Sequence, residues 1–164
     1  MIKKGVYTMS NDVSYPKVYL NDFMESNRSV FKKVSETLCD VILTLDTFLS
    51  SSVFYEICYR SNPKYLNMSY KQLLECLSYD DKFDWINTKP TGEEYDSYIM
   101  WWVGMILTHF QWKYRVDFRD WLKYFSVKDV YNMYYPLHEA SVSVSADKLF
   151  EMYQYKKEHK QFRK

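Results

Sequence analysis

Residues 98–110 read YIMWWVGMILTHF, the longest apolar run in a chain of 164 residues. At 13 residues, with Thr108 and His109 inside it, the run is shorter than the roughly 18 residues that a membrane-spanning helix needs. Its apolar side chains surround most of a helix circumference, which is typical of a helix in the middle of a bundle. Thr91-Gly92-Glu93-Glu94 forms a capping-box pattern, so we expect this nearly all-apolar central helix over about residues 92–114.

Two residues of this run, Trp102 and Gly104, belong to a motif to which we assign a structural role. A glycine inside a helix costs about 1 kcal/mol relative to alanine. The absence of a Cβ offsets that cost only where another helix approaches closely. Gly104 therefore predicts close helix–helix packing.

The composition around this helix indicates an all-α fold. Only three glycines and four prolines occur, too few for a glycine-rich phosphate loop or a many-turned β-sandwich. Apolar residues make up 47% of the chain, enough to bury one core without disulfide or metal support. We expect a compact single-domain helical bundle.

The pattern along the chain divides it into three parts. Residues 1–20 lack helical periodicity and are expected to lie as an arm over the body, residues 21–155 to form the helical domain, and residues 156–164 to form a basic helix end or tail. From Ser29 to Cys58, apolar residues recur at steps of three and four. They predict one long helix, kinked near residues 50–52 and ending before Pro63.

Shorter helices are predicted from capping patterns. Ser69-x-x-Gln72 predicts a helix up to about Tyr79. Asp117 and Ser126 read as N-caps of two short helices, the second ending at Pro136. Residues 140–144 are expected as a loop, and residues 145–147 as the start of the last helix.

No pattern for catalysis, a metal or a cofactor stands out. His109, His138 and His159 are 29 and 21 residues apart, and the three cysteines form no CxxC pair. We therefore expect no enzyme activity, no metal and no cofactor, with reduced thiols in a cytoplasmic protein that has no membrane segment. An enzyme with a site assembled in the tertiary structure around His138 or His109 remains a minor alternative.

Charge is distributed unevenly. Residues 75–96 carry seven acidic side chains and two lysines, a net −5, and Asp80, Asp81 and Asp84 lie within this stretch. It is either a solvated loop or an acidic docking surface for a basic partner. Residues 156–164 carry five basic residues and one acid, a net +4, which could contact nucleic acid. The near-neutral total argues against a dedicated nucleic-acid binder, and a solvated helix end is the simpler interpretation.

Aromatic residues exceed what a small core requires, with 17 Tyr, 5 Trp and 10 Phe. Tyrosine and tryptophan are enriched at protein interfaces. The richest stretch is residues 124–135, and some of its aromatic side chains are expected on a partner-binding face that the acidic region 75–96 flanks. The residues assigned to this face are Trp121, Tyr131, Tyr134, Tyr135, His138, Asp80, Asp81 and Asp84.

Several short motifs carry a family resemblance over roughly residues 45–152. They are Trp102-Val103-Gly104, Tyr134 followed four residues later by His138, and Phe48-Leu49-Ser50-Ser51 with Tyr55 or Ile57 downstream. With these motifs the chain resembles a family of small, all-helical bacterial proteins encoded near genes of toxin–antitoxin systems, whose toxins resemble ADP-ribosyltransferases. The chain departs from that family at Thr108, where an arginine would be expected, and at residues 116–118, which replace a serine-rich turn.

The resemblance implies an antitoxin-like protein. We expect a protein-binding inhibitor that neutralises a toxin or a host-defence enzyme by covering its active cleft. One alternative is a phage-type anti-defence inhibitor of the anti-CRISPR kind, and another is a nucleic-acid-associated protein that uses the basic C-terminal helix. The same aromatic face could also pair two copies of the chain.

Overall fold

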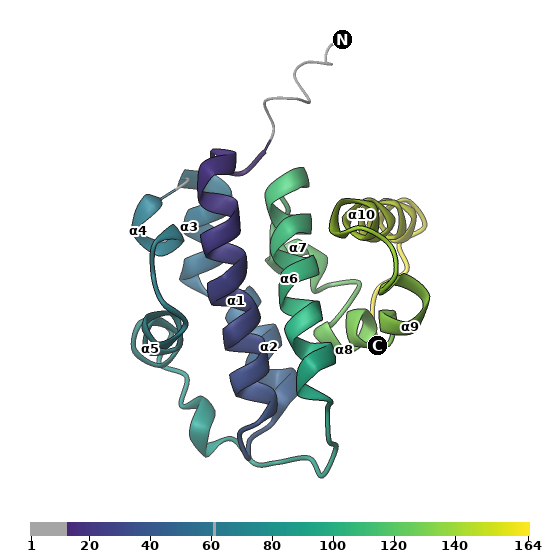
Figure 1. Ribbon diagram of the computed structural model, residues 1–164. Helices are drawn as coiled ribbons and strands as arrows, with labels where there is room; N and C mark the ends of the chain where they lie inside the picture. Colours follow the sequence, from purple (N-terminus) through teal and green to yellow (C-terminus); the bar gives the residue numbers. More distant parts are fainter. Residues whose placement is uncertain (1–12, 61) are drawn as a thin grey trace.

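The computed structural model describes residues 13–60 and 62–164, and within these ranges it is helical and has no β-strand. This confirms the all-α, single-domain bundle. Figure 1 shows the arrangement of the helices. Their bounds are η2 Lys17–Tyr19, α1 Leu20–Ser35, α2 Val41–Leu49, α3 Ser52–Arg60, α4 Pro63–Leu66, α5 Tyr70–Asp80, η3 Trp85–Asn87, α6 Ser97–Tyr114, α7 Phe118–Trp121, α8 Val127–Tyr131, α9 Tyr134–Leu137 and α10 Val142–Glu158.

The long helices α1 and α6 form the antiparallel pair at the centre of the bundle (Figure 1). α6 contacts α1 on one side and α10, α8 and α9 on others, and α5 and α2 pack against α1. α6 is thus buried from several directions, as the apolar side chains around most of its circumference predicted.

At Gly104, α1 and α6 approach each other closely. A Cβ built on it would lie 2.9 Å from the Cα of Arg28 and 3.0 Å from Cγ of Phe31. One turn further along α6, the Thr108 hydroxyl accepts a hydrogen bond from the Asn27 side-chain amide at 3.0 Å and donates to the Gly104 carbonyl oxygen at 2.7 Å. The prediction of close packing at Gly104 is confirmed.

The predicted start of the central helix at about residue 92 is wrong. α6 begins at Ser97, and its N-cap is Asp96, whose carboxylate accepts from the backbone N–H groups of Tyr98 and Ile99. The Thr91 hydroxyl instead accepts from the N–H of Glu93 in the preceding loop. Glu93 pairs there with Lys128 of α8 at 3.0 Å, and this contact holds the loop away from helical geometry.

The single helix predicted from residue 29 onward is also divided. α1 begins earlier, at Leu20, and ends at Ser35, and α2 begins at Val41 after the side chain of Asp40 accepts from the N–H of Leu43. Leu38 fits the helical period, yet it lies between the two helices and is 82% exposed. The predicted kink near residues 50–52 is confirmed by the break between α2 and α3.

Val41–Arg60 is long and apolar enough by length and composition to cross a membrane. In the fold this stretch is divided into α2 and α3, and 56% of its most apolar window is buried inside the protein. The burial accounts for the apolar composition in the way expected of core helices.

Two boundaries in the C-terminal part differ from the predictions. α8 ends at Tyr131, so Pro136 does not terminate it. Pro136 instead lies in the first turn of α9. Backbone N–H groups in the first turn of a helix have no helical acceptor, so the helix loses no hydrogen bond to the proline there. The last helix begins at Val142, because the Ser141 hydroxyl accepts from the N–H of Val144.

Residues 13–19 cross the ends of the central helices. Ser14 and Tyr15 are buried, and the backbone N–H of Ser14 donates to the carbonyl oxygen of Trp112 at 2.9 Å. The indole N–H of Trp112 donates to the carbonyl oxygen of Tyr15 at 2.8 Å. The rest of the expected N-terminal arm, residues 1–12, lies outside the described residues.

Candidate protein-binding site

Trp121, one of the residues expected at the partner-binding face, is a core residue. It is 1% exposed, lies at the end of α7 and stacks on Phe125 with ring centroids 5.4 Å apart. Phe110 and Phe118 pack edge-on against it. A partner cannot contact Trp121 in this fold, so its assignment to the face is corrected. Its ring faces inward, against Phe110 of α6.

Tyr131, at the end of α8, is half-buried and holds a loop in place. Its hydroxyl oxygen accepts a hydrogen bond from the N–H of Asp96 at 2.8 Å, and its ring meets Tyr95 edge to face at 5.0 Å. It thereby fixes the residue that caps α6. Its role in the structure is to position the start of α6, beside the surface described next.

Tyr134, Tyr135 and His138 lie together on α9 at the surface. Tyr135 is 76% exposed. Tyr134 packs its ring edge to face against Trp102 of α6 at 5.2 Å, and the imidazole of His138 stacks on Tyr134 at 4.6 Å. One ring nitrogen of His138, Nδ1, lies 3.0 Å from the carbonyl oxygen of Tyr135. These contacts order the rings before any partner binds.

Tyr98, in the first turn of α6, completes this group. It is 61% exposed. Its ring packs against Trp101 at 5.5 Å, next along α6 to Trp102, which supports Tyr134. Burial raises the pKa of Tyr134, and the charges of Tyr98, Tyr135 and Asp96 raise it further. We call Tyr98, Tyr134, Tyr135 and His138 the aromatic surface. The sequence analysis missed Tyr98 because its prediction placed the first helical turn at residue 92, which put this side chain well inside the helix.

Asp80, Asp81 and Asp84 do not lie beside the aromatic surface. They follow from the end of α5, which Figure 1 shows on the opposite side of the α1–α6 pair from α9. Asp80 and Asp84 are exposed, whereas Asp81 is partly buried and accepts from the N–H of Ser52 at 3.4 Å. Burial raises the pKa of Asp81. The prediction that these acids share one face with the aromatic residues is therefore wrong, because α1 and α6 lie between α5 and α9.

The basic tail is docked onto the bundle. α10 ends at Glu158, Lys160 takes a left-handed conformation with φ 51°, and the chain turns back toward the segment that joins α7 to α8. There the ring of Phe162 stacks on Tyr124 at 5.1 Å, and the N–H of Arg163 donates to the carbonyl oxygen of Lys123 at 2.8 Å.

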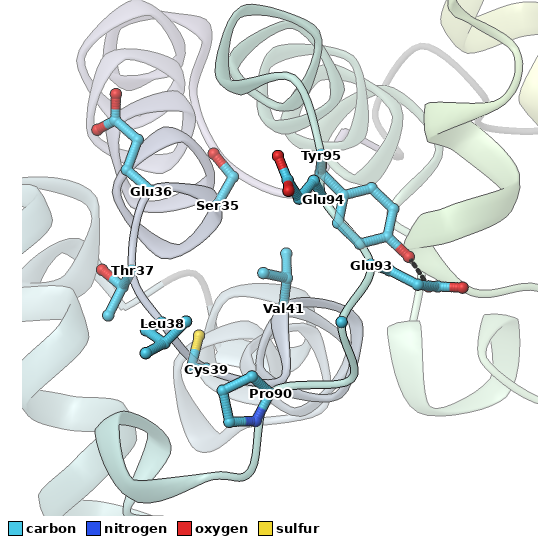
Figure 2. A pocket seen from close by; sticks show the side chains of 11 residues that line it. Ser35, Glu36, Thr37, Leu38, Cys39, Val41, Pro90, Glu93, Glu94 and Tyr95 are labelled. Carbon is cyan, nitrogen blue, oxygen red and sulfur yellow. Dashed lines mark hydrogen bonds between the residues drawn. The ribbon is translucent and has the colours of Figure 1, made fainter.

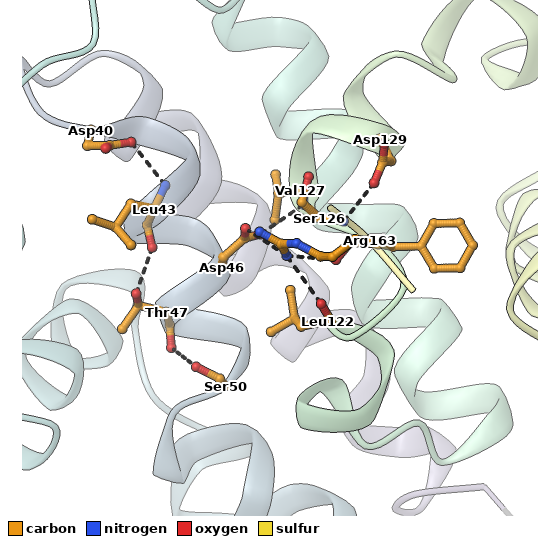
Figure 3. A network of polar contacts seen from close by, with 11 residues as sticks. Asp40, Leu43, Asp46, Thr47, Ser50, Leu122, Ser126, Val127, Asp129 and Arg163 are labelled. Carbon is orange, nitrogen blue, oxygen red and sulfur yellow. Dashed lines mark hydrogen bonds and ion pairs between the residues drawn. The ribbon is translucent and has the colours of Figure 1, made fainter. Parts of the chain in front are cut away.

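The guanidinium of Arg163 lies at the centre of a polar network (Figure 3). It donates to the carbonyl oxygens of Phe125 at 2.9 Å and Leu122 at 3.3 Å, and it lies 3.4 Å from the carboxylate of Asp46 on α2. Asp46 also accepts from the N–H of Val127 at 2.9 Å. Burial of this carboxylate raises its pKa to about 6, although Val127 and Arg163 act in the opposite direction.

These contacts occupy most of the positive charge of the tail. Lys156 donates to the carbonyl oxygen of Tyr124, and Lys157 pairs with Asp120 at 3.0 Å. Within the described ranges only Lys160 and Lys164 of the five basic tail residues have no such partner. Residues 157–164 are nevertheless exposed, as expected of a solvated helix end, and Phe162 and Arg163 add specific contacts to the bundle that the sequence did not indicate.

An open hollow of about 350 Å³ lies between the turn after α1 and the loop before α6 (Figure 2). Glu36, Glu93 and Glu94 line it, and the thiol of Cys39 lies at its wall. Burial raises the pKa of the Cys39 thiol, so the thiol stays protonated and is a poor nucleophile. The Tyr95 hydroxyl and Lys128 both engage Glu93, which removes this carboxylate as a free acid or base.

The histidines do not converge in the structure. His109 lies partly buried in α6 beside Trp112, and burial lowers the pKa of its imidazole. His138 lies on α9 and His159 at the end of α10. Among residues 13–60 and 62–164, no group of three or more His, Cys, Asp or Glu side chains is arranged to hold a metal ion.

Comparison with known proteins adds no relative: no family model, no curated protein and no solved structure matches this chain. The aromatic surface is therefore interpreted from its own geometry.

Proposed function

We propose that this protein is a protein-binding inhibitor of the antitoxin type, which covers the active cleft of a toxin or a host-defence enzyme. The observation that supports binding is the aromatic surface. Tyr98 and Tyr135 are exposed by 61% and 76%, and Tyr134 and His138 stack behind them. The inhibitor class rests on the resemblance of residues 45–152 to proteins encoded near toxin–antitoxin genes.

The rings are suited to a contact because little conformational entropy is lost when they bind. Trp102 supports Tyr134 from below, and Tyr134 in turn contacts Tyr135 at 5.3 Å. Rigid aromatic side chains at the centre of an interface commonly contribute 2 kcal/mol or more, about a 30-fold change in affinity. The partner is expected to present an apolar cleft that these rings fill.

The chain contains a matched control for this surface. Tyr155 and His159 of α10 form a second tyrosine–histidine pair at the same spacing, stacked at 4.1 Å, and Tyr155 is 53% exposed. Substituting Tyr155 removes a similar amount of exposed aromatic area at another place on the molecule. Any generic effect of losing a surface tyrosine should appear in both variants.

The experiment begins with the full chain, tagged and cross-linked in its own cells, and identifies the bound protein by mass spectrometry. Binding of that purified partner and inhibition of its activity are then measured with Tyr135→Ala, Tyr98→Ala and Tyr155→Ala. We expect the first two variants to bind at least about tenfold more weakly and to inhibit less, and Tyr155→Ala to match the unmodified protein. Equal binding by all three would exclude the aromatic surface, and self-association alone would replace the proposal with a homodimer.

The nucleic-acid alternative gains nothing from the geometry. The tail residues that would contact phosphates, Lys156, Lys157 and Arg163, are engaged with carbonyl oxygens and carboxylates of the bundle. The protein-binding proposal is preferred for that reason.

A further inference from the structure

A second surface lies on the other side of the bundle, around α5. A groove of about 570 Å³ runs between α5 and η3, lined by Leu74, Glu75, Ser78, Tyr79, Trp85 and Ile86. We call it the α5–η3 groove. A smaller hollow of about 260 Å³ continues on the other side of Tyr79, where it reaches Met68 and Cys76. Glu75 and Tyr79 border both hollows.

The floor of this groove is apolar and its large side chains are exposed. Leu74 and Trp85 are buried and form part of the core, whereas Tyr79 is 84% and Ile86 59% exposed. Both exposed side chains lie at the groove itself, on two different elements. Exposed apolar side chains gathered around a concave surface mark an interaction site more often than scattered ones do.

The charge around the two hollows is acidic. Glu75 lines both the groove and the smaller hollow, and Asp80 lines the smaller hollow. Of the described residues, no Lys or Arg lines either one, and the chain from residue 75 to 87 carries Glu75, Asp80, Asp81 and Asp84 against one lysine, Lys82. A partner that places apolar residues in the groove therefore gains further from basic residues at its edges.

We infer that the α5–η3 groove binds a basic amphipathic helix of a partner protein. Such a helix presents apolar residues at positions i, i+3, i+4 and i+7 and carries lysine or arginine beside them, which complements an apolar floor with acidic edges. α5, which lines the groove, lies across the α1–α6 pair from α9, which carries Tyr134 and Tyr135 (Figure 1). The groove is thus a second contact site, separate from the proposed inhibitory one.

This arrangement assigns a role to the acidic residues that the aromatic surface leaves unused. Asp84 precedes η3 and accepts a hydrogen bond from the Asn87 side chain at 2.6 Å, so it orders the short helix that carries Trp85 and Ile86. Asp80 is exposed and lines the adjoining smaller hollow. One acid orders a local turn, and the other contributes charge.

The test uses the full chain, isotopically labelled, and a synthetic helical peptide of about four turns, built of leucine on one face and lysine on the other. Addition of the peptide should shift the amide resonances of α5 and η3 and the indole resonance of Trp85. A peptide with glutamate in place of lysine, and a peptide of the same composition in scrambled order, serve as ligand controls. Both should bind at least about tenfold more weakly than the lysine peptide.

Variants locate the binding. Ile86→Asp should lower the affinity for the lysine peptide by about tenfold or more. Glu75→Lys should also lower this affinity and should reduce its dependence on salt. Leu38→Asp, which alters an exposed leucine elsewhere, and Tyr135→Ala on the aromatic surface should leave it unchanged. Absence of binding, equal binding of the glutamate peptide, or resonance shifts centred away from α5 and η3 would each overturn the inference. None of these outcomes depends on the aromatic surface, so the two proposals fail independently.

Discussion

Gly104 shows how one missing Cβ sets the distance between the two central helices. A methyl group at this position would lie 2.9 Å from the Cα of Arg28, 3.0 Å from Phe31 and 3.1 Å from the carbonyl oxygen of Asn27. Two of these three atoms belong to the backbone of α1, so relief requires the helices to move apart. The same separation would lengthen the hydrogen bond between Asn27 and Thr108.

We predict that Gly104→Ala destabilises the protein by about 1–2 kcal/mol, because the cost of overpacking exceeds the roughly 1 kcal/mol that alanine gains in helix propensity. Urea unfolding measures the change. Gln154→Ala, at an exposed position of α10, is the control and should alter stability by less than about 0.5 kcal/mol. A higher urea midpoint for Gly104→Ala would contradict this prediction, because it would show that α1 can move to accommodate the methyl group without loss of stability.

Asp46 gives the stability of the protein a specific pH dependence. Its carboxylate has a pKa of about 6 in the fold, above its ordinary value of 3.8, because burial disfavours the ionised form more than Arg163 and Val127 favour it. A raised pKa means that the folded state binds the proton more tightly than the unfolded chain does. This contribution to stability is complete below pH 4 and is lost as the pH rises through 6.

The unmodified protein should therefore gain about 2–3 kcal/mol relative to Asp46→Asn as the pH falls from 7 to 4. Urea unfolding of both proteins across this pH range measures the difference in their free energies of unfolding. Titration of the other groups affects both proteins alike and therefore largely cancels in that difference. A difference that stays constant with pH would contradict the raised pKa.

Two residues near the start of α6 have side chains that could cap the helix, and tertiary contacts determine which of them does so. Thr91 and Asp96 both have favoured N-cap side chains. The contacts of Glu93 with Lys128 and of Tyr131 with the Asp96 N–H hold residues 91–96 in a loop, and Asp96 then accepts from Tyr98 and Ile99. Tyr98 then lies in the first turn of α6, where it is 61% exposed.

We predict that Asp96→Ala lowers the free energy of unfolding by about 1 kcal/mol, since two N–H groups of the first turn lose their acceptor. Thr91→Ala should cost less, because its hydroxyl accepts only from the loop N–H of Glu93. Thermal unfolding of the two variants compares them directly. A larger loss in Thr91→Ala would favour the cap position that the sequence predicted.

At the scale of the whole molecule, the C-terminus closes the bundle across a long stretch of chain. Arg163 connects α2 to the segment between α7 and α8. Its guanidinium donates to the carbonyl oxygens of Leu122, which caps α7, and of Phe125 in the segment that follows. The neighbouring Lys164 has no such contact among the described residues, although it carries the same charge.

We expect Arg163→Ala to destabilise the protein by about 1–2 kcal/mol, because two carbonyl oxygens lose a charged donor and the Asp46 carboxylate loses its cation. Lys164→Ala should leave the urea midpoint nearly unchanged. If both variants unfold alike, the tail contributes nothing to the bundle. Its charge would then be free to act elsewhere, which would reopen the nucleic-acid alternative.

Patterns that are local in the sequence were sufficient to predict the fold class and several of the helices. The apolar run 98–110 predicted the central helix, Gly104 its close packing, and Ser69 with Gln72 the capping box of α5. Each signal depends on residues within about one or two helical turns, so periodicity and capping preferences suffice to recognise it.

The tertiary structure decided which aromatic side chains are buried, where α6 begins, where the tail docks and which charges lie together. Trp121 and Tyr135 look equivalent in the sequence, yet one is 1% and the other 76% exposed. Asp80 and Tyr134 were expected on one face, but they belong to α5 and α9, which lie on opposite sides of the α1–α6 pair (Figure 1). Burial and surface proximity depend on contacts between residues tens of positions apart, and local periodicity carries no information about those contacts.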